Sequence, residues 1–275
     1  MGNIIFKEKK GSMSEYSNII NKMVWSYSKL SMYEQCKYAF YLKYIVNDNK
    51  QYLDEGNYYA ESGSFVHDTL AKVYNNEISS DEAIAYFINN YDNNIFHETY
   101  KNAMDSTFEK CSDYFTEKKF EWCSKYEIID VEKKVNFIID GYRFIGYIDL
   151  LLNDKKNNKI ILVDHKSSKY PFKKNGELSK GSKEIFEKYK RQMYLYAYAV
   201  NDVYGKFPDK IVWNHFKDGG RLAEIPFSKR DYNKSLKWIV DTIHDIEKEE
   251  DWPDKKDIFY CNNLCGFRSS CEYNL

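Results

Sequence analysis

The fold is decided by one stretch, F-I-G-Y-I-D-L-L-L over residues 144–152, N-D-K-K-N-N-K over 153–159 and I-I-L-V-D-H-K over 160–166. Two apolar runs, both rich in β-branched residues, flank a segment of Asn, Asp and Lys. This pattern predicts two antiparallel strands joined by a short turn. The rest of the chain can be placed around these two strands.

Charged side chains stand near the end of each predicted strand. Asp149 lies near the end of the first run, and Asp164 and Lys166 lie near the end of the second. Residues two apart in a strand share a face, so Asp164 and Lys166 point the same way and His165 points the other way. Charges at the end of a buried strand are costly unless they bind a cation or react. The alternative is a solvated strand end with a chance ion pair, because surface ion pairs are common.

Helices and further strands surround this pair. A preceding strand ends at Asp140-Gly141, a dipeptide typical of hairpin turns, so we expect three consecutive strands. Helical spacing of apolar residues predicts helices from Ser26 or Ser28 to Leu42 (with Cys36 inside), from Gly63 onward, across 81–126, over 183–204 and over 228–249, with strands at 211–216 and 223–227. The order predicts a three-layer α/β fold, a sheet flanked by helices on both sides.

The composition indicates a globular protein. At 275 residues, with 43% hydrophobic and 30% charged residues, the chain fits one large domain or two small ones. No apolar run approaches the roughly 18 residues of a spanning helix, and the N-terminus lacks a secretory signal, so we expect a cytoplasmic protein without a membrane partner. We predict a flexible arm over residues 1–22 and a single domain over 23–275, with a helical insertion at about 75–126 and a C-terminal tail at 258–275.

The charge is unevenly distributed. The net charge of −1 gives no general support for nucleic-acid binding, but residues 166–191 contain nine Lys or Arg against three Glu. A basic segment beside carboxylates suggests a phosphate-bearing substrate. We therefore expect the loop 167–182, with Lys169, Lys173 and Lys174, to contact DNA. An ordinary solvated loop and helix face is the alternative.

The six cysteines are partly clustered. Three of them lie within residues 261–271, and a fourth, Cys36, lies near the N-terminus. A disulfide framework is not expected in a cytoplasmic protein, so clustered cysteines favour metal or iron–sulfur ligation. Cys111 and Cys123 are expected to pack as small hydrophobic residues.

The polar residues suit phosphodiester chemistry. Two carboxylates from neighbouring strands can bind Mg²⁺ or Mn²⁺, which activates water. Lys166 could orient that water or neutralise the phosphate, and His67 could add a nitrogen ligand, which would favour Mn²⁺. Gln192 and Tyr196 lie four residues apart on one helix face and could bind the substrate. Each of these features is weak on its own.

Their order carries a resemblance. The motifs are Gly63-x-x-x-His67, Gly146-Tyr-Ile-Asp149, Asp164-His-Lys166 and Gln192-x-x-x-Tyr196. From about Trp25 to Cys271 the chain resembles the RecB-like branch of the PD-(D/E)XK nuclease superfamily, including the CRISPR-associated RecB-like adaptation nucleases and the nuclease domains of RecB and AddB. The resemblance implies a restriction-endonuclease-like core, a mixed sheet flanked by helices, with a helical N-terminal region and a C-terminal cysteine cluster.

The resemblance also implies a role for each residue. The metal ligands would be His67, Asp149, Asp164 and the backbone carbonyl of His165. The catalytic residues would be Asp149, Asp164 and Lys166. Gln192 and Tyr196 would position DNA, and Glu132 could match a further acidic position.

The cysteines extend the resemblance. Iron–sulfur members of this branch place one cysteine before the nuclease core and three after it, as do Cys36, Cys261, Cys265 and Cys271 here. Four thiolates suit a [4Fe–4S] cluster. The family more often has two residues between the first pair of the C-terminal trio, whereas this chain has three. A zinc site with four cysteines and three unrelated thiols near the C-terminus are the alternatives.

These features favour a metal-dependent DNA exonuclease or end-processing enzyme of recombination, repair or defence. Its substrate would be DNA that is single-stranded or has free ends, and protein partners in a recombination, repair or CRISPR complex are possible. One alternative is a non-catalytic DNA- or partner-binding module on the same fold. Another is a structural cluster protein with a redox-sensing role.

Overall fold

The structure is a computed structural model that describes residues 14–46, 58–94, 101–269 and 271–273. The chain forms two compact units. The first unit comprises residues 1–57, 136–146 and 230–275, and the second unit comprises residues 58–135 and 147–229.

The first unit is mainly helical, and the second contains most of the sheet. The first contains α1 (Ser17–Ile20), α2 (Tyr27–Gln35), α3 (Lys37–Phe40), the π-helical turn η1 (Tyr41–Ile45), α8 (Lys229–Glu247) and α9 (Ile258–Asn263). The second contains α4 (Tyr58–Tyr74), α5 (Ala83–Asn94), α6 (Lys101–Thr116), η3 (Lys119–Cys123), β3 (Lys159–Lys166), α7 (Ser182–Tyr204), β4 (Lys210–His215), η4 (Phe216–Asp218) and β5 (Arg221–Pro226). The hairpin strands β1 (Glu127–Ile139) and β2 (Tyr142–Asp154) run through both units.

The five strands form one mixed sheet in the order β1-β2-β3-β4-β5. β2 pairs antiparallel with β3, placing Leu150 opposite Val163, and β3 pairs parallel with β4, while β5 is antiparallel to β4. β1 and β2 join at Asp140 and Gly141, whose φ angles of 49° and 83° suit a type I′ turn. The predicted run of three consecutive strands is confirmed.

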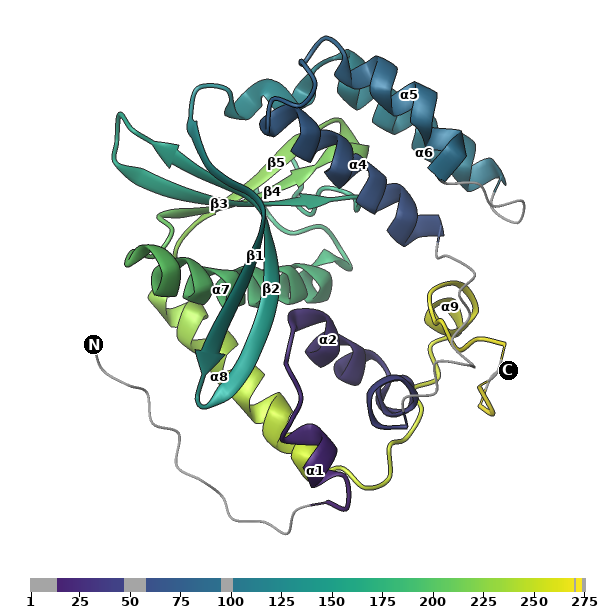
Figure 1. Ribbon diagram of the computed structural model, residues 1–275. Coiled ribbons are helices and arrows are strands. Elements are labelled where there is room, and N and C mark those ends of the chain that lie inside the picture. Colours follow the sequence, from purple (N-terminus) through teal and green to yellow (C-terminus); the bar gives the residue numbers. More distant parts are fainter. Residues whose placement is uncertain (1–13, 47–57, 95–100, 270, 274–275) are drawn as a thin grey trace. The chain divides into compact units, whose positions relative to one another are not determined.

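Helices cover both faces of the sheet in the second unit (Figure 1). On one face, Leu150 and Val163 join a core cluster that contains Phe115 of α6 and residues of α4 and α5. On the other face, the ring of Phe186 in α7 lies 4.9 Å from that of Trp213 in β4. Strands buried on both faces read as continuous apolar runs, which explains the uninterrupted I-I-L-V of β3.

Two local predictions were wrong. Cys36 does not lie within a helix: its extended backbone, with φ of −158°, separates α2 from α3, and its sulfur accepts the Ala39 N–H at 3.5 Å as an N-cap. Periodicity does not detect this break, because both short helices continue the same apolar spacing. Gly63 does not open α4, which already begins at Tyr58. Ser26 caps α2, as predicted.

The predicted domain boundaries stay predictions. Residues 1–13 of the expected arm lie outside the described residues, and α1 follows with Ile20 buried. The expected helical insertion corresponds to α5, α6 and η3, and the C-terminal tail contains α9. Within the described chain, no helix is long and apolar enough to cross a membrane.

Candidate active site

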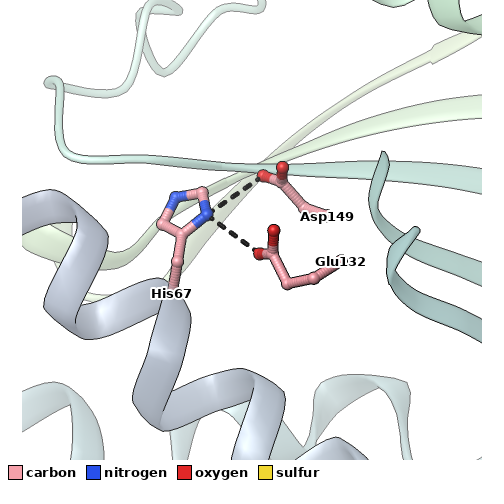
Figure 2. Close-up of side chains that lie close together, drawn as sticks. All are labelled: His67, Glu132 and Asp149. Carbon is pink, nitrogen blue, oxygen red and sulfur yellow. Dashed lines mark hydrogen bonds and ion pairs between the residues drawn. The ribbon is translucent and has the colours of Figure 1, made fainter. Parts of the chain in front are cut away.

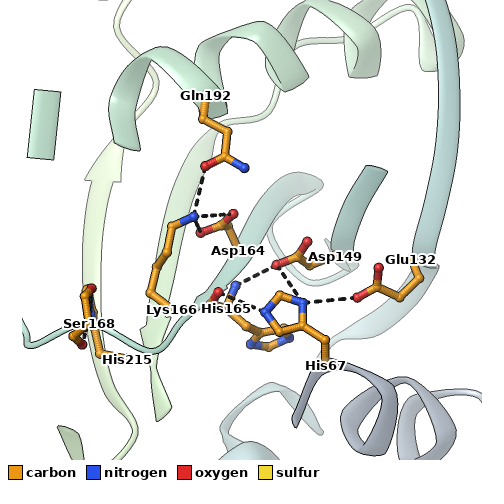
Figure 3. A network of polar contacts seen from close by, with 9 residues as sticks. All are labelled: His67, Glu132, Asp149, Asp164, His165, Lys166, Ser168, Gln192 and His215. Carbon is orange, nitrogen blue, oxygen red and sulfur yellow. Dashed lines mark hydrogen bonds and ion pairs between the residues drawn. The ribbon is translucent and has the colours of Figure 1, made fainter. Parts of the chain in front are cut away.

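A cavity of about 710 Å³ in the second unit collects most of the predicted site residues. Helix α4, strands β1 to β3 and helix α7 contribute to its wall. The lining comprises Tyr59, Ala60, Gly63, Ser64, His67, Asp68, Ala71, Lys72, Asn75, Glu77, Glu132, Asp149, Asp164, His165, Lys166, Ser167, Gln192 and Phe216. The motifs that lie far apart in the sequence therefore meet at one place (Figure 3).

His67 reaches the sheet from α4 (Figure 2). The apolar stripe of this helix packs in the core, which directs the imidazole toward the strands. Its Nε2 donates to the carbonyl oxygen of His165 at 3.1 Å, and its Nδ1 lies 3.5 Å from Asp149 Oδ2 and 3.4 Å from Glu132 Oε1. Burial alone would lower the pKa of His67, but Asp149 and Glu132 raise it to about 9. The metal-free protein therefore holds an imidazolium between two acids.

The two predicted carboxylates are shielded from solvent, Asp164 buried and Asp149 partly buried. The side chains of Asp149 and Asp164 are 11% and 4% exposed. Burial raises the pKa of both, that of Asp164 to about 6, and the main-chain N–H of His165 donates to Asp149 Oδ2 at 2.8 Å. The charge of Asp149 also raises the pKa of Asp164, and shielding two such carboxylates from solvent is costly unless cations compensate them.

Lys166 compensates one of them. As the alternation of the strand predicts, it shares a face with Asp164, and its Nζ lies 3.0 Å and 2.8 Å from Oδ1 and Oδ2. The same nitrogen donates to Gln192 Oε1 at 2.9 Å and lies 4.8 Å from the centre of the Tyr189 ring. Burial alone would lower the pKa of Lys166, but Asp164 raises it above its ordinary value, so the amine stays protonated.

The residues fit a hard divalent cation. A ring nitrogen of His67 and one carboxylate oxygen each of Asp149 and Glu132 all lie within 4.8 Å of one another. The His165 carbonyl oxygen contacts Nε2 at 3.1 Å, which is the other ring nitrogen than the one that faces the two carboxylates. Oxygen donors with one imidazole suit Mg²⁺ or Mn²⁺. Asp164 lies outside this trio, so its role as a metal ligand stays a prediction.

Glu132 is the site residue that the sequence indicated most weakly. Its φ of 46° is in the left-handed region, which glutamate rarely adopts, so nothing in V-E-K-K-V signals it. Strained backbones cluster at functional sites. Here the strained residue lies within β1, and its carboxylate points toward His67 (Figure 2).

Exchanging Glu132 for glycine is expected to give a protein about 1 kcal/mol more stable than the alanine variant, because glycine adopts this φ without strain. Both variants lack the carboxylate, so their difference isolates the backbone. Urea unfolding measures it, with the same pair of exchanges at Glu224 in the regular strand β5 as the control, where alanine should be the more stable. If the alanine variant at position 132 is the more stable one, the left-handed backbone assigned to Glu132 is contradicted.

The predicted substrate-binding residues differ in position. Gln192 lines the cavity and contacts Lys166, and Tyr196 lies one turn further along α7, 9% exposed and hydrogen-bonded to Gln192. Lys169, Lys173 and Lys174 are exposed in the segment between β3 and α7, and none of them lines the cavity. Their contact with DNA stays a prediction. Tyr189, whose ring lies against the Lys166 amine, was missed because a lone aromatic residue on an amphipathic helix carries no signal.

The four predicted cluster cysteines meet in the first unit. Cys36, Cys261, Cys265 and Cys271 line one small cavity. Cys36 and Cys265 are 7% and 6% exposed. Burial, together with the neighbouring thiols, raises the pKa of Cys265 and Cys271. Cys111 and Cys123 are buried in the core of the second unit, as predicted.

The chain is similar to solved structures and matches one family model. A protein of Eubacterium rectale described as a candidate exonuclease has a crystal structure similar to this chain at 15% identity, with a TM-score of 0.49 and 91% of each chain covered. The crystal structure of SSO0001 is similar at 16% identity, with a TM-score of 0.33, covering 77% of this chain and 96% of that one. None of the curated proteins compared with the chain matches it. The family model described as the PD-(D/E)XK nuclease superfamily matches residues 24–272, nearly the whole chain, and the chain therefore belongs to that superfamily.

Proposed function

We propose that this chain is a divalent-metal-dependent deoxyribonuclease of the RecB-like branch, an exonuclease or end-processing enzyme of recombination, repair or defence. The observation that carries the proposal is the convergence of His67, Asp149, Asp164 and Lys166 on one cavity (Figure 3). A protonated lysine can stabilise charge on the phosphate, and a metal held by hard donors can activate the water that hydrolyses a phosphodiester.

The residues divide the work. Those that would hold Mg²⁺ or Mn²⁺ are His67, Glu132, Asp149, Asp164 and the carbonyl oxygen of His165. When bound, such a cation lowers the pKa of a water molecule and offsets charge on the phosphate. Lys166 is protonated and donates to the attacked phosphate or to the attacking water, while Gln192 and Tyr189 fix its amine. Binding the cation requires His67 to release its proton.

Helix α7 and the loop that precedes it, residues 167–182, would hold DNA. Gln192 and Tyr196 of α7 position the strand at the cavity. The exposed lysines Lys169, Lys173 and Lys174 would contact phosphates outside the cavity, where cations add affinity without sequence preference.

A cleavage assay on different forms of DNA tests the proposal. End-labelled linear single-stranded and double-stranded DNA and a closed circle are incubated with Mn²⁺ and the wild-type or Asp149→Asn protein. We expect the wild type to degrade the linear forms and spare the circle, and Asp149→Asn to spare all three. Asp154→Asn, at the end of the same strand and outside the cavity, is the matched control. Tight DNA binding with no cleavage would indicate a non-catalytic binding module instead.

The affinity for Mn²⁺ is expected to rise with pH. His67, with a pKa of about 9, must lose its proton, and Asp164, with a pKa raised by burial to about 6, must be ionised. Affinity should rise about tenfold per pH unit between 6 and 9, and about 100-fold per unit below 6, where both groups are protonated. Calorimetric titrations from pH 5.5 to 8.5 measure this, and Asp164→Asn should lose the steeper part. An affinity that does not change over this range would contradict the assignment.

We also propose that the four cysteines of the first unit hold a [4Fe–4S] cluster, with zinc as the alternative. Around tetrahedral zinc, sulfur atoms lie about 3.8 Å apart, given Zn–S bonds of about 2.3 Å. Among the described residues, the one trio of His, Cys, Asp or Glu with ligand atoms within 4.8 Å is His67, Glu132 and Asp149, so no three of these thiols are that close. The observation that supports a shared ligand set is that all four thiols line one small cavity.

Exchanging Cys265 for serine is expected to abolish the brown colour of anaerobically purified protein. It should also lower the thermal midpoint by on the order of 10 °C, because the cluster ties Cys36 to the C-terminal tail across a long loop. Cys123→Ser is the matched control, since that buried thiol donates to the Phe120 carbonyl and serine can do the same. A colourless wild-type protein that contains one zinc per chain would contradict the cluster and support the zinc site.

A further inference from the structure

A buried polar chain lies behind the active site. On the sheet face covered by α4 to α6, the amide nitrogen of Asn214 in β4 lies 3.0 Å from His165 Nδ1 and donates to the hydroxyl of Tyr114 in α6 at 2.7 Å. All three residues are buried: His165 is 4% exposed, Asn214 is 0% exposed and Tyr114 is 1% exposed. The proposed function uses the main-chain carbonyl of His165 but none of these three side chains.

Burying this hydrogen-bonded group of His165, Asn214 and Tyr114 costs free energy. Asn214 uses both of its N–H bonds, so His165 Nδ1 accepts and the ring carries its proton on Nε2. That Nε2 and the Asn214 amide oxygen are buried without a hydrogen-bond partner in the part of the chain that the structure describes. Burying unpaired polar groups is unfavourable, and apolar side chains of similar size would avoid the cost. A role for the arrangement therefore has to be sought in what His165 holds.

The main chain of His165 touches both sides of the metal site. Its N–H donates to Asp149 Oδ2 at 2.8 Å, and its carbonyl oxygen accepts from His67 Nε2 at 3.1 Å (Figure 3). Its ring meets the His67 ring edge-on at 5.5 Å and stacks on Tyr74 of α4 at 6.0 Å. One residue thus contacts Asp149 and His67 through its main chain and Asn214 through its side chain.

We propose that His165 is a positioning residue: Asn214 and Tyr114 hold its imidazole so that its two peptide groups stand in register with Asp149 and His67. The inference concerns the side chain and the strand behind the site, and it deepens the proposed function, on whose metal site it rests. Partners behind a ligand set typically change metal affinity by 10- to 100-fold when they are removed.

Two measurements on one variant series test the proposal. Asn214→Leu keeps the volume and removes both hydrogen bonds. In the metal-free protein, hydrogen exchange at the His165 amide should accelerate on the order of tenfold, because its bond to Asp149 loosens. Mn²⁺ affinity, measured by calorimetry, should fall on the order of tenfold. Tyr114→Phe removes one hydroxyl, and it is expected to show both effects more weakly, which keeps the test open if Asn214→Leu does not fold.

The controls separate positioning from general loosening. Thr69→Val removes a buried hydrogen bond within α4, from Oγ1 to the Phe65 carbonyl, and it should change neither readout. His165→Asn, whose side-chain oxygen can replace Nδ1 as the acceptor, should retain the affinity that His165→Leu loses.

The outcomes are distinct. Unchanged exchange and affinity in Asn214→Leu, or equal changes in Thr69→Val, would overturn the inference. If exchange at His165 accelerates as expected but the wild type binds no Mn²⁺, the proposed function fails while the positioning of the peptide stands.

Discussion

Exchanging Asp164 for asparagine is expected to lower the rate of DNA cleavage by about 10³-fold. The carboxylate is 4% exposed, and its Oδ1 accepts a hydrogen bond from the Lys166 amine, which also lies 2.8 Å from Oδ2. The amide keeps the shape but removes the charge, so it weakens the hold on a cation and leaves the lysine without its counter-ion. Removing one partner of a buried ion pair should also lower the free energy of unfolding by about 3 kcal/mol.

Rates at saturating Mn²⁺ and urea unfolding of the same preparations measure both effects. Asp209→Asn is the matched control, because that carboxylate accepts the Ile160 N–H at the beginning of the same strand and lies outside the cavity. Cleavage by Asp164→Asn within tenfold of the wild-type rate would remove Asp164 from the catalytic set.

Exchanging Lys166 for methionine is expected to lower the cleavage rate by 10²- to 10³-fold, while Mn²⁺ affinity changes little. Methionine has a similar length but neither the charge nor the donors that the developing phosphate charge needs. The amine contacts Asp164, Gln192 and the Tyr189 ring, so it is held in place before substrate arrives. Arginine is not expected to rescue the variant, because its planar guanidinium does not fit a point-charge site.

Single-turnover rates and Mn²⁺ titrations of the methionine variant separate the catalytic from the binding effect. Lys210→Met, in the neighbouring strand β4 and paired with Glu224, is the control. A Lys166→Met protein that cleaves normally but no longer binds Mn²⁺ would assign the lysine to the metal site instead.

Local patterns predicted the sheet well. The apolar runs around 153–159 and the turn at Asp140-Gly141 depend on neighbouring residues, and both strand pairings appear as expected. The shared face of Asp164 and Lys166 follows from the two-residue period of a strand. The three layers follow from the order of the elements, whereas the mixed sheet was implied by the resemblance to a family.

Features set by tertiary structure could not be predicted from patterns. No spacing rule brings His67 of α4 to Asp149 of β2, and that pairing came from the resemblance to a family. The left-handed backbone of Glu132 could not be predicted from the sequence, since glutamate rarely adopts this conformation. The break at Cys36 was missed because its thiol caps the following helix while the apolar spacing continues.

One measurement tests the central claim most directly: the rate of cleavage of end-labelled linear DNA as a function of free Mn²⁺, for the wild-type and His67→Ala proteins. We predict no cleavage with excess chelator, a wild-type rate that rises to a plateau, and a curve for His67→Ala displaced to at least about tenfold higher Mn²⁺. Cleavage that is independent of Mn²⁺, or curves that coincide for the two proteins, would contradict a metal-dependent nuclease site built on His67, Asp149, Asp164 and Lys166.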